Sequence, residues 1–106
     1  MSYRFMRMLV MFDLPTETAE DKRNYRKFRK TLIKNGFYMM QESIYTRMAL
    51  TPSVQRSAVE VIRKNKPPCG TVQVMTVTEK QFSQMEYITG EYHSEVIDSD
   101  ERLIIL

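Results

Sequence analysis

An α+β sandwich is the fold class that this sequence of 106 residues predicts, and three observations support it. The apolar run at residues 8–12 is continuous, which indicates a central strand with both faces buried. Two later stretches, residues 25–32 and 54–62, carry apolar residues at helical spacing. The segments that separate and follow these stretches are rich in β-branched and aromatic residues, as strands are.

The first strand and the first helix have clear boundaries in the sequence. The strand is expected to end at Asp13, because Pro15 has no N–H to donate to a sheet. Thr16 or Thr18 can cap the helix that follows, and Gly36 can supply the left-handed residue after its last turn. The apolar stripe of this helix consists of Tyr25, Phe28 and Leu32, with Ile33 at its edge.

The middle of the chain predicts more strand and a second helix. Residues 37–49 have strand-like content, and the polar pair Gln41 and Glu42 indicates a bend, a bulge or a hairpin-like break. The second helix should begin at residues 51–53, where Pro52 is acceptable in the first turn, and end within residues 65–70. Its apolar stripe consists of Val54, Ala58, Val59 and Ile62.

Residues 71–78 alternate in polarity and predict the last long strand, and the few apolar residues at 82–88 suffice for one helical turn. The order β-α-β-β-α-β is the split βαβ pattern of a ferredoxin-like sandwich, here a single domain over residues 1–106.

A short apolar strand at the C-terminus follows a polar linker and needs an external sheet edge. It predicts a homodimer in which each copy adds this strand to the partner's sheet. The strand consists of Leu103, Ile104, Ile105 and Leu106.

The composition excludes several classes of protein. With 42% hydrophobic and 27% charged residues, the chain is an ordinary globular one. Cys69 and His93 are the only cysteine and histidine, which excludes an internal disulfide and a Cys/His zinc cluster within one chain. No apolar run is long enough to cross a bilayer, and the sequence shows no secretory signal. A lone thiol suits a reducing cytosol. We therefore expect a cytoplasmic protein without membrane contact. The enzyme classes that remain use carboxylates.

Positive charge is concentrated in the first third of the chain. Residues 1–36 carry nine Lys and Arg against four Asp and Glu, whereas residues 81–106 carry one against six. Seven basic residues share one arc of the first helix, opposite its apolar stripe: Lys22, Arg23, Arg26, Lys27, Arg29, Lys30 and Lys34. Like charges on neighbouring turns repel, so this arc favours phosphate binding, which gives affinity and salt dependence without sequence readout. A merely solvated face is the alternative.

Asp13 stands at the carboxyl end of the predicted central strand, where a carboxylate needs a partner. It can serve in a turn or cap before Pro15, pair with a cation, or bind a metal ion. One carboxylate does not hold a divalent cation tightly. Two copies of Asp13 across a dimer axis could hold one Mg²⁺, with water completing the octahedron.

Several segments, taken in order, resemble a known protein family. They are residues 8–14 (MLVMFDL), 22–30 (KRNYRKFRK), 36–37 (GF), 41–45 (QESIY) and 76–82 (TVTEKQF). Together they resemble the second, smaller universal CRISPR-associated adaptation protein, the partner of the CRISPR integrase, in the branch that accompanies single-effector (type II) systems. The chain departs from the commonest pattern at Phe12, where a tyrosine is frequent, so any role of that hydroxyl is absent.

The resemblance implies a homodimer that bridges integrase dimers on captured duplex DNA during spacer acquisition. It also implies the Mg²⁺-dependent endonuclease activity, on RNA or DNA, that is described for some members, with Asp13 of each copy as the metal ligand. Two other functions remain open: a toxin-like metal-dependent endoribonuclease of similar fold, and a non-catalytic RNA-binding ferredoxin-like module. The second of these is disfavoured, because no strand combines basic and aromatic residues as RNA-binding sheets of this fold do.

Overall fold

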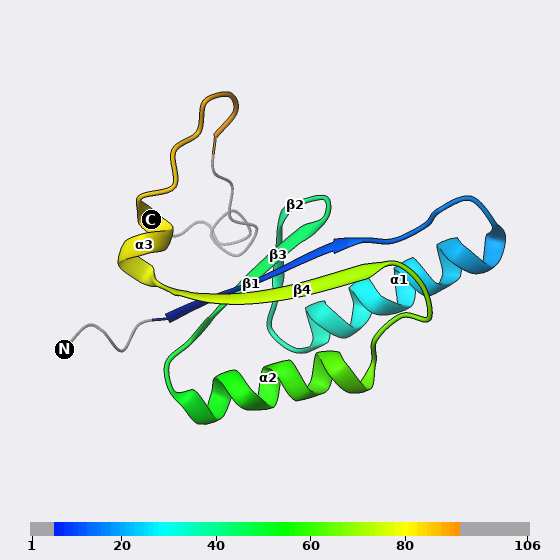
Figure 1. Cartoon of the computed structure of the whole chain (residues 1–106), viewed down its shortest axis with the longest axis horizontal. Helices are drawn as coiled ribbons and strands as arrows, with labels where there is room; N and C mark the ends of the chain where they lie inside the picture. Colours follow the sequence, from blue (N-terminus) through cyan, green and yellow to red (C-terminus); the bar gives the residue numbers. More distant parts are fainter. Residues whose placement is uncertain (1–5, 92–106) are drawn as a thin grey trace.

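Four strands and three helices make up residues 6–91, the part of the chain that the structure, a computed structural model, describes. The strands are β1 (Met6–Asp13), β2 (Tyr38–Gln41), β3 (Ile44–Ala49) and β4 (Thr71–Thr78). The helices are α1 (Ala19–Lys34), α2 (Pro52–Lys64) and α3 (Glu79–Ser83). The strands form one sheet, and α1 and α2 lie on the same face of it (Figure 1).

The sheet has the strand order β2-β3-β1-β4, and every neighbouring pair is antiparallel. β1 therefore lies inside the sheet, between β3 and β4, as its continuous apolar run predicted. α1 joins β1 to β2 and α2 joins β3 to β4, which is the ferredoxin-like arrangement, so the predicted fold class is confirmed. The predicted C-terminal strand, residues 103–106, lies outside the described residues.

Local hydrogen bonds set the two ends of α1. The Thr18 hydroxyl accepts from the Asp21 N–H (3.0 Å), and the Asp21 carboxylate accepts from the Thr18 N–H (3.2 Å), so Thr18 is the cap. After the last turn Gly36 has φ +89°. Its missing side chain leaves room for Arg47, whose Nη1 donates to the Asn35 carbonyl oxygen (2.7 Å) and satisfies the helix end.

The central segment resolves the alternatives that its sequence left open. The break predicted near residues 41–42 is a hairpin turn between β2 and β3, and a bulge accompanies it between Met39 and Gln41. α2 begins as expected, with Thr51 as its cap and Pro52 as its first residue. α3 is the single helical turn expected after β4, and Ile88, which is 85% exposed, lies outside it.

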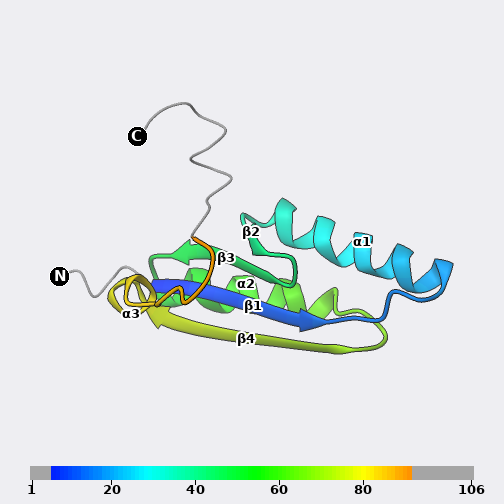
Figure 2. The same cartoon turned by 90° about the horizontal axis from the view of Figure 1, so that it is seen from above.

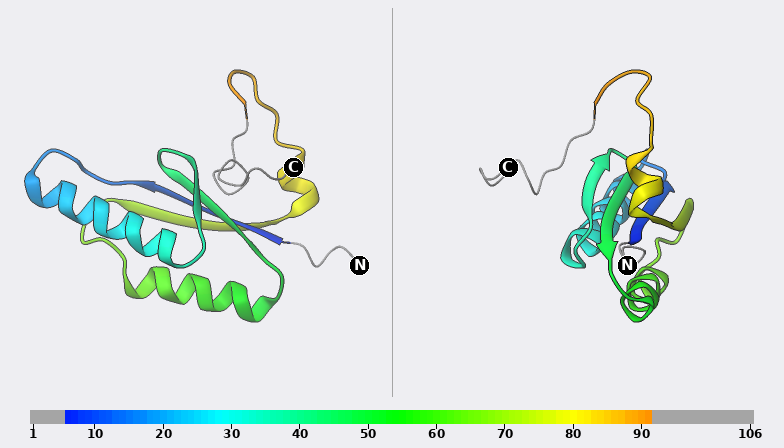
Figure 3. Two further views of the ribbon diagram at one scale, coloured as in Figure 1. Left: turned by 180° about the vertical axis from the view of Figure 1, so that it is seen from behind. Right: turned by 90° about the vertical axis from the view of Figure 1, so that its left-hand side faces the viewer.

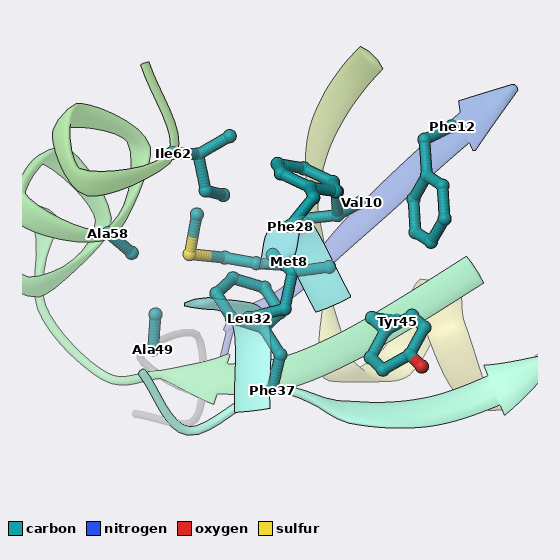
Figure 4. Packing of buried hydrophobic residues seen from close by; sticks show 10 residues of the cluster. All are labelled: Met8, Val10, Phe12, Phe28, Leu32, Phe37, Tyr45, Ala49, Ala58 and Ile62. Atoms are coloured by element: carbon teal, nitrogen blue, oxygen red, sulfur yellow. The ribbon is translucent and has the colours of Figure 1, made fainter. Parts of the chain in front are cut away.

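The core lies between the helices and the face of the sheet that they cover. Met8, Val10 and Phe12 point from β1 toward the helices (Figure 4). The Phe12 ring meets the Phe28 ring edge-on, with centroids 5.3 Å apart, a favourable aromatic geometry. The other buried members are Leu32, Phe37, Tyr45, Ala49, Ala58 and Ile62. Val54 was expected in this core and is 36% exposed instead, in the first turn of α2.

The opposite face of the sheet carries the alternate residues of the strands. Because Met8 and Val10 face the helices, Arg7 and Leu9 face the other way. Met75 of β4 stands opposite Leu9 of β1, so its side chain lies on this same face. Met75 is 50% exposed, so this methionine of β4 faces solvent and does not fill the core. Neither α1 nor α2 covers this face, as the views from behind and end-on make clear (Figure 3).

Candidate metal and nucleic-acid sites

Asp13 is the last residue of β1 and is exposed, directly after the buried Phe12. The strand alternates, so Asp13 falls on the same face as Leu9 and Met11, away from the helices. It lies at the end of the sheet where the β1–α1 loop leaves, and α3 lies at the other end (Figure 2). Its carboxylate is therefore open to solvent and to ligands on the face that no long helix covers.

The turn before β4 fixes the backbone of this strand end. Gly70 has φ +92°, and a Cβ at that position would lie 2.6 Å from the Asp13 carbonyl oxygen and 2.8 Å from the Leu14 side chain. Only glycine fits so close to another backbone segment at this φ. β4 then pairs with β1 from Thr71, which stands opposite Asp13.

The donors around Asp13 limit what metal ion it can hold. Within residues 6–91 no group of three or more His, Cys, Asp or Glu side chains could hold a metal ion. Asp13 supplies a carboxylate, the ligand type that Mg²⁺ prefers, and its exposure lets water fill the remaining positions. The residues therefore fit a weakly held Mg²⁺ if a second carboxylate comes from another copy of the chain.

The predicted basic arc of α1 is a continuous exposed surface. All seven residues are exposed: Lys22, Arg23, Arg26, Lys27, Arg29, Lys30 and Lys34. Among the described residues, none of them forms an ion pair with a carboxylate. Arg29 differs from the rest, because its Nε donates to the hydroxyl of the buried Tyr45 and thus ties it to β3. The other six guanidinium and ammonium groups are available to an external polyanion.

Asp13 and the basic arc lie on opposite sides of the sheet. The buried Phe28 and Leu32 of α1 face the sheet, so the basic arc, on the far side of that helix, points away from it. Asp13 falls on the other face, with Leu9 and Met11. The two candidate sites therefore lie on different surfaces of the described part of the chain.

Sequence reasoning missed an ion pair between the buried Arg7 and the partly exposed Glu79. Arg7 Nε and Nη2 donate to the two Glu79 oxygens (3.0 and 2.7 Å), Nη1 donates to the Tyr38 hydroxyl (2.7 Å), and the guanidinium lies over Phe82. Burial alone would lower the pKa of Arg7, but the hydrogen bonds with Glu79 and Tyr38 raise it above its usual value. The sequence does show that Arg7 is an arginine within an otherwise apolar strand, but it does not indicate which residue pairs with Arg7.

Other predicted features have simple outcomes. Cys69 is exposed in the turn before β4. His93 and the four residues Leu103, Ile104, Ile105 and Leu106 lie outside the described range. Among the helices within residues 6–91, none has the length and apolar character needed to span a bilayer.

Comparisons with known proteins agree with one another. The family described as "CRISPR associated protein Cas2" matches residues 6–85. A "CRISPR-associated endoribonuclease Cas2" of Treponema denticola is 52% identical over 101 residues, which cover 95% of this chain and all of the relative. The protein of the same name from Streptococcus mutans serotype c is 45% identical, over 95% of this chain and 93% of its own. A solved structure titled "Crystal structure of cas2" superposes with a TM-score of 0.60 at 14% identity, covering 85% of this chain and 92% of its own, which supports the fold.

Proposed function

This chain belongs to the CRISPR-associated Cas2 family, and we propose that it is a CRISPR-associated endoribonuclease that hydrolyses phosphodiester bonds at Asp13. The relatives' shared name supports the activity class. The observation that carries the assignment to Asp13 is its position: an exposed carboxylate at the end of the central strand, on the face that α1 and α2 leave uncovered.

Asp13 would hold one Mg²⁺ together with the Asp13 of a second copy. A bound Mg²⁺ supplies a water of lowered pKa and neutralises charge on the attacked phosphate, the two needs of phosphodiester hydrolysis. The protein's part is to keep the carboxylate in place: Gly70 packs on the Asp13 carbonyl, and pairing with β4 extends to that residue. Without a cation, two approaching carboxylates would repel, which disfavours their close approach.

A homodimer would bring the two carboxylates together, and two features of the described residues favour it. The sheet face opposite α1 and α2 presents methionines, among them Met75 (50% exposed) and Met48 (40% exposed), a residue type enriched at interfaces. The edge strand β4 is eight residues long, whereas the other edge strand, β2, has four. β4 is thus the edge on which a partner's residues 103–106 could add a strand.

The basic arc of α1 favours a second role, as the adaptor that bridges integrase dimers on captured duplex DNA. Six exposed cations with no acidic partner among the described residues would neutralise backbone phosphates of a duplex irrespective of its sequence. Phosphate contacts that do not depend on base sequence suit a protein that must hold DNA of any sequence. This role needs no turnover, so it is compatible with slow or absent cleavage.

The nuclease proposal is tested with purified chain on single-stranded RNA and duplex DNA, with Mg²⁺ and with a chelator. The unaltered chain should cleave only with Mg²⁺, and Asp13→Asn should remove cleavage because the amide carries no charge to hold the cation. Asp21→Asn is the matched control, since Asp21 serves only as a partner in the cap of α1. Equal cleavage by the unaltered chain and Asp13→Asn would exclude Asp13 as the site.

A further inference from the structure

Arg29 is the cation of the basic arc whose side chain the fold holds in place. Its Nε donates to the Tyr45 hydroxyl (2.5 Å), so this long side chain is tethered at the guanidinium itself. Within residues 6–91 the side chains of the six other arc residues have no such tether. A free lysine or arginine side chain loses rotamer freedom when a ligand fixes it, whereas Arg29 has lost much of that freedom before any ligand binds.

Tyr45 is a rigid support for this tether. The residue is 0% exposed, and on β3 it stands between Met39 of β2 and Val10 of β1 in the register of the sheet. Its ring also packs on the Phe12 ring, with centroids 5.7 Å apart, and its oxygen points out of the labelled cluster (Figure 4). A ring enclosed in this way has little room to move, so its hydroxyl keeps a fixed position.

The rest of the Arg29 guanidinium can reach a ligand. Arg29 is exposed, and within the described part of the chain its Nη1 and Nη2 have no carboxylate partner. The helix positions three or four residues away carry no acid: Tyr25, Arg26, Leu32 and Ile33. Nη1 and Nη2 form a planar fork that matches two oxygens of one phosphate. Arg29 can therefore give its Nε to the protein and its fork to a phosphate.

We infer that Tyr45 is a positioning residue, which pre-organises Arg29 to bind a backbone phosphate through Nη1 and Nη2. This role rests on the proposed nucleic-acid binding and extends it from the surface of α1 to a buried residue of β3. The same hydrogen bond also gives the buried Tyr45 hydroxyl a partner, which is a purely structural use. The two uses differ in one consequence, because only positioning links the Tyr45 hydroxyl to the affinity for a polyanion.

The test measures duplex affinity against salt concentration for Tyr45→Phe, which removes the hydroxyl and keeps the ring and every charge of the arc. Affinity should fall about 2- to 10-fold, because Arg29 must then be ordered at the moment of binding. The slope of log K against log[salt] should stay the same, because the phosphate contact is still made. Tyr25→Phe is the matched control: it removes a hydroxyl that donates to the Glu42 carbonyl oxygen (3.2 Å), and affinity should not change.

The decisive comparison repeats Tyr45→Phe in a chain that already carries Arg29→Ala. Arg29→Ala alone should weaken binding and lower the slope by about 0.9 for each chain that contacts the duplex. Adding Tyr45→Phe should then have no further effect on affinity, because no guanidinium remains to be positioned. Arg29→Lys keeps the charge but lacks Nε and the fork, so it should bind more weakly at an unchanged slope. Thermal unfolding shows whether each variant is fully folded at the assay temperature.

The outcomes separate this role from the function on which it rests. If the unaltered chain binds neither duplex DNA nor RNA, or binds them no better than Arg23→Ala/Arg26→Ala/Lys30→Ala, both proposals fail. If Arg29→Ala weakens duplex binding while Tyr45→Phe matches the unaltered chain, only the positioning role is overturned. An equal loss from Tyr45→Phe with and without Arg29 would overturn it too, because the hydroxyl would then act on the fold and not on the cation. Full affinity in Arg29→Lys would contradict the use of the fork.

Discussion

At the scale of single residues, Arg7 stands out as a charged side chain inside the central strand. Its side chain is 8% exposed and its hydrogen bonds to Glu79 and Tyr38 satisfy it. A buried charge is tolerated only when it is paired, and removal of its partner costs more than the pair contributes. The pair also ties α3 to β1, 72 residues earlier in the chain.

Glu79→Gln should destabilise the chain by about 1–2 kcal/mol, because the amide NH₂ cannot accept from Arg7 and a buried donor loses its partner. Chemical denaturation measures the change. Glu60→Gln is the matched control: its ion pair with Arg63 is long and exposed, so a change below about 0.5 kcal/mol is expected. Equal losses in the two variants would contradict a special role for the pair between Arg7 and Glu79.

The pH dependence of this loss follows from the raised pKa of Arg7. A cation with a raised folded-state pKa stabilises the fold at every pH below its unfolded value and loses that effect only near the folded value. Both values lie far above neutrality for arginine. The difference in stability between the unaltered chain and Glu79→Gln should therefore stay constant from about pH 7 to about pH 10.

The sequence predicts some of the residues discussed above and not others. Asp13 could be predicted because an acid after a continuous apolar run is unusual wherever it lies. The pairing of Arg7 with Glu79 could not, because it depends on how the chain turns after β4. The side on which Asp13 falls depends on strand alternation relative to the helices, which only the assembled sheet defines.

At the scale of elements, local chemistry determined most boundaries. Thr18 and Thr51 cap α1 and α2, and β4 spans the alternating segment without shift. The segment at residues 38–49 could not be resolved from its composition, because bends, bulges and hairpins use similar residues. Its hairpin is specified by pairing with β1, a contact distant in sequence.

The two glycines with φ near +90° at the helix–strand connections should differ in their tolerance of alanine. Gly70→Ala places a Cβ 2.6 Å from the Asp13 carbonyl oxygen, an atom of the sheet backbone that cannot move freely. Gly36→Ala meets the flexible Arg47 side chain at 3.2 Å. Both substitutions incur the strain of positive φ, so each should cost about 1 kcal/mol or more, with the larger loss at Gly70. Thermal unfolding of the two variants compares them, and an equal or smaller loss at Gly70 would contradict the close contact.

At the scale of the whole molecule, the ferredoxin-like sandwich leaves one sheet face that neither α1 nor α2 covers, and α3 packs on only one end of it. That face carries the exposed Met48 and Met75 together with Asp13, while the other side carries α1 and its cations. The amphipathic pattern of α1 was sufficient to predict the basic arc. The orientation of that arc relative to Asp13 required the fold.

Deletion of residues 103–106 should convert a dimer to monomer or aggregate, because the terminal strand is expected to add to a partner's sheet edge. Light scattering on the full chain and the truncated chain measures this. Replacement of the same four residues by four threonines keeps the length and strand propensity but removes apolar burial, and should weaken the dimer too. If the truncated chain remains entirely dimeric, the C-terminal residues are not needed for the dimer, and the interface lies on the sheet face opposite α1 and α2.

We propose that a dimer of this chain binds nucleic acid through α1 and cleaves it through its two Asp13 carboxylates, on opposite sides of the sheet. The most direct test measures binding and Mg²⁺-dependent cleavage of the same labelled RNA and duplex DNA by three proteins: the unaltered chain, Asp13→Asn, and Arg23→Ala/Arg26→Ala/Lys30→Ala. Arg29 is left intact because it holds Tyr45. Asp13→Asn should lose cleavage and keep duplex affinity and its salt slope, whereas the triple variant should lose duplex affinity and about 2.7 of that slope. Loss of duplex binding in Asp13→Asn, or retained cleavage, would contradict the claim.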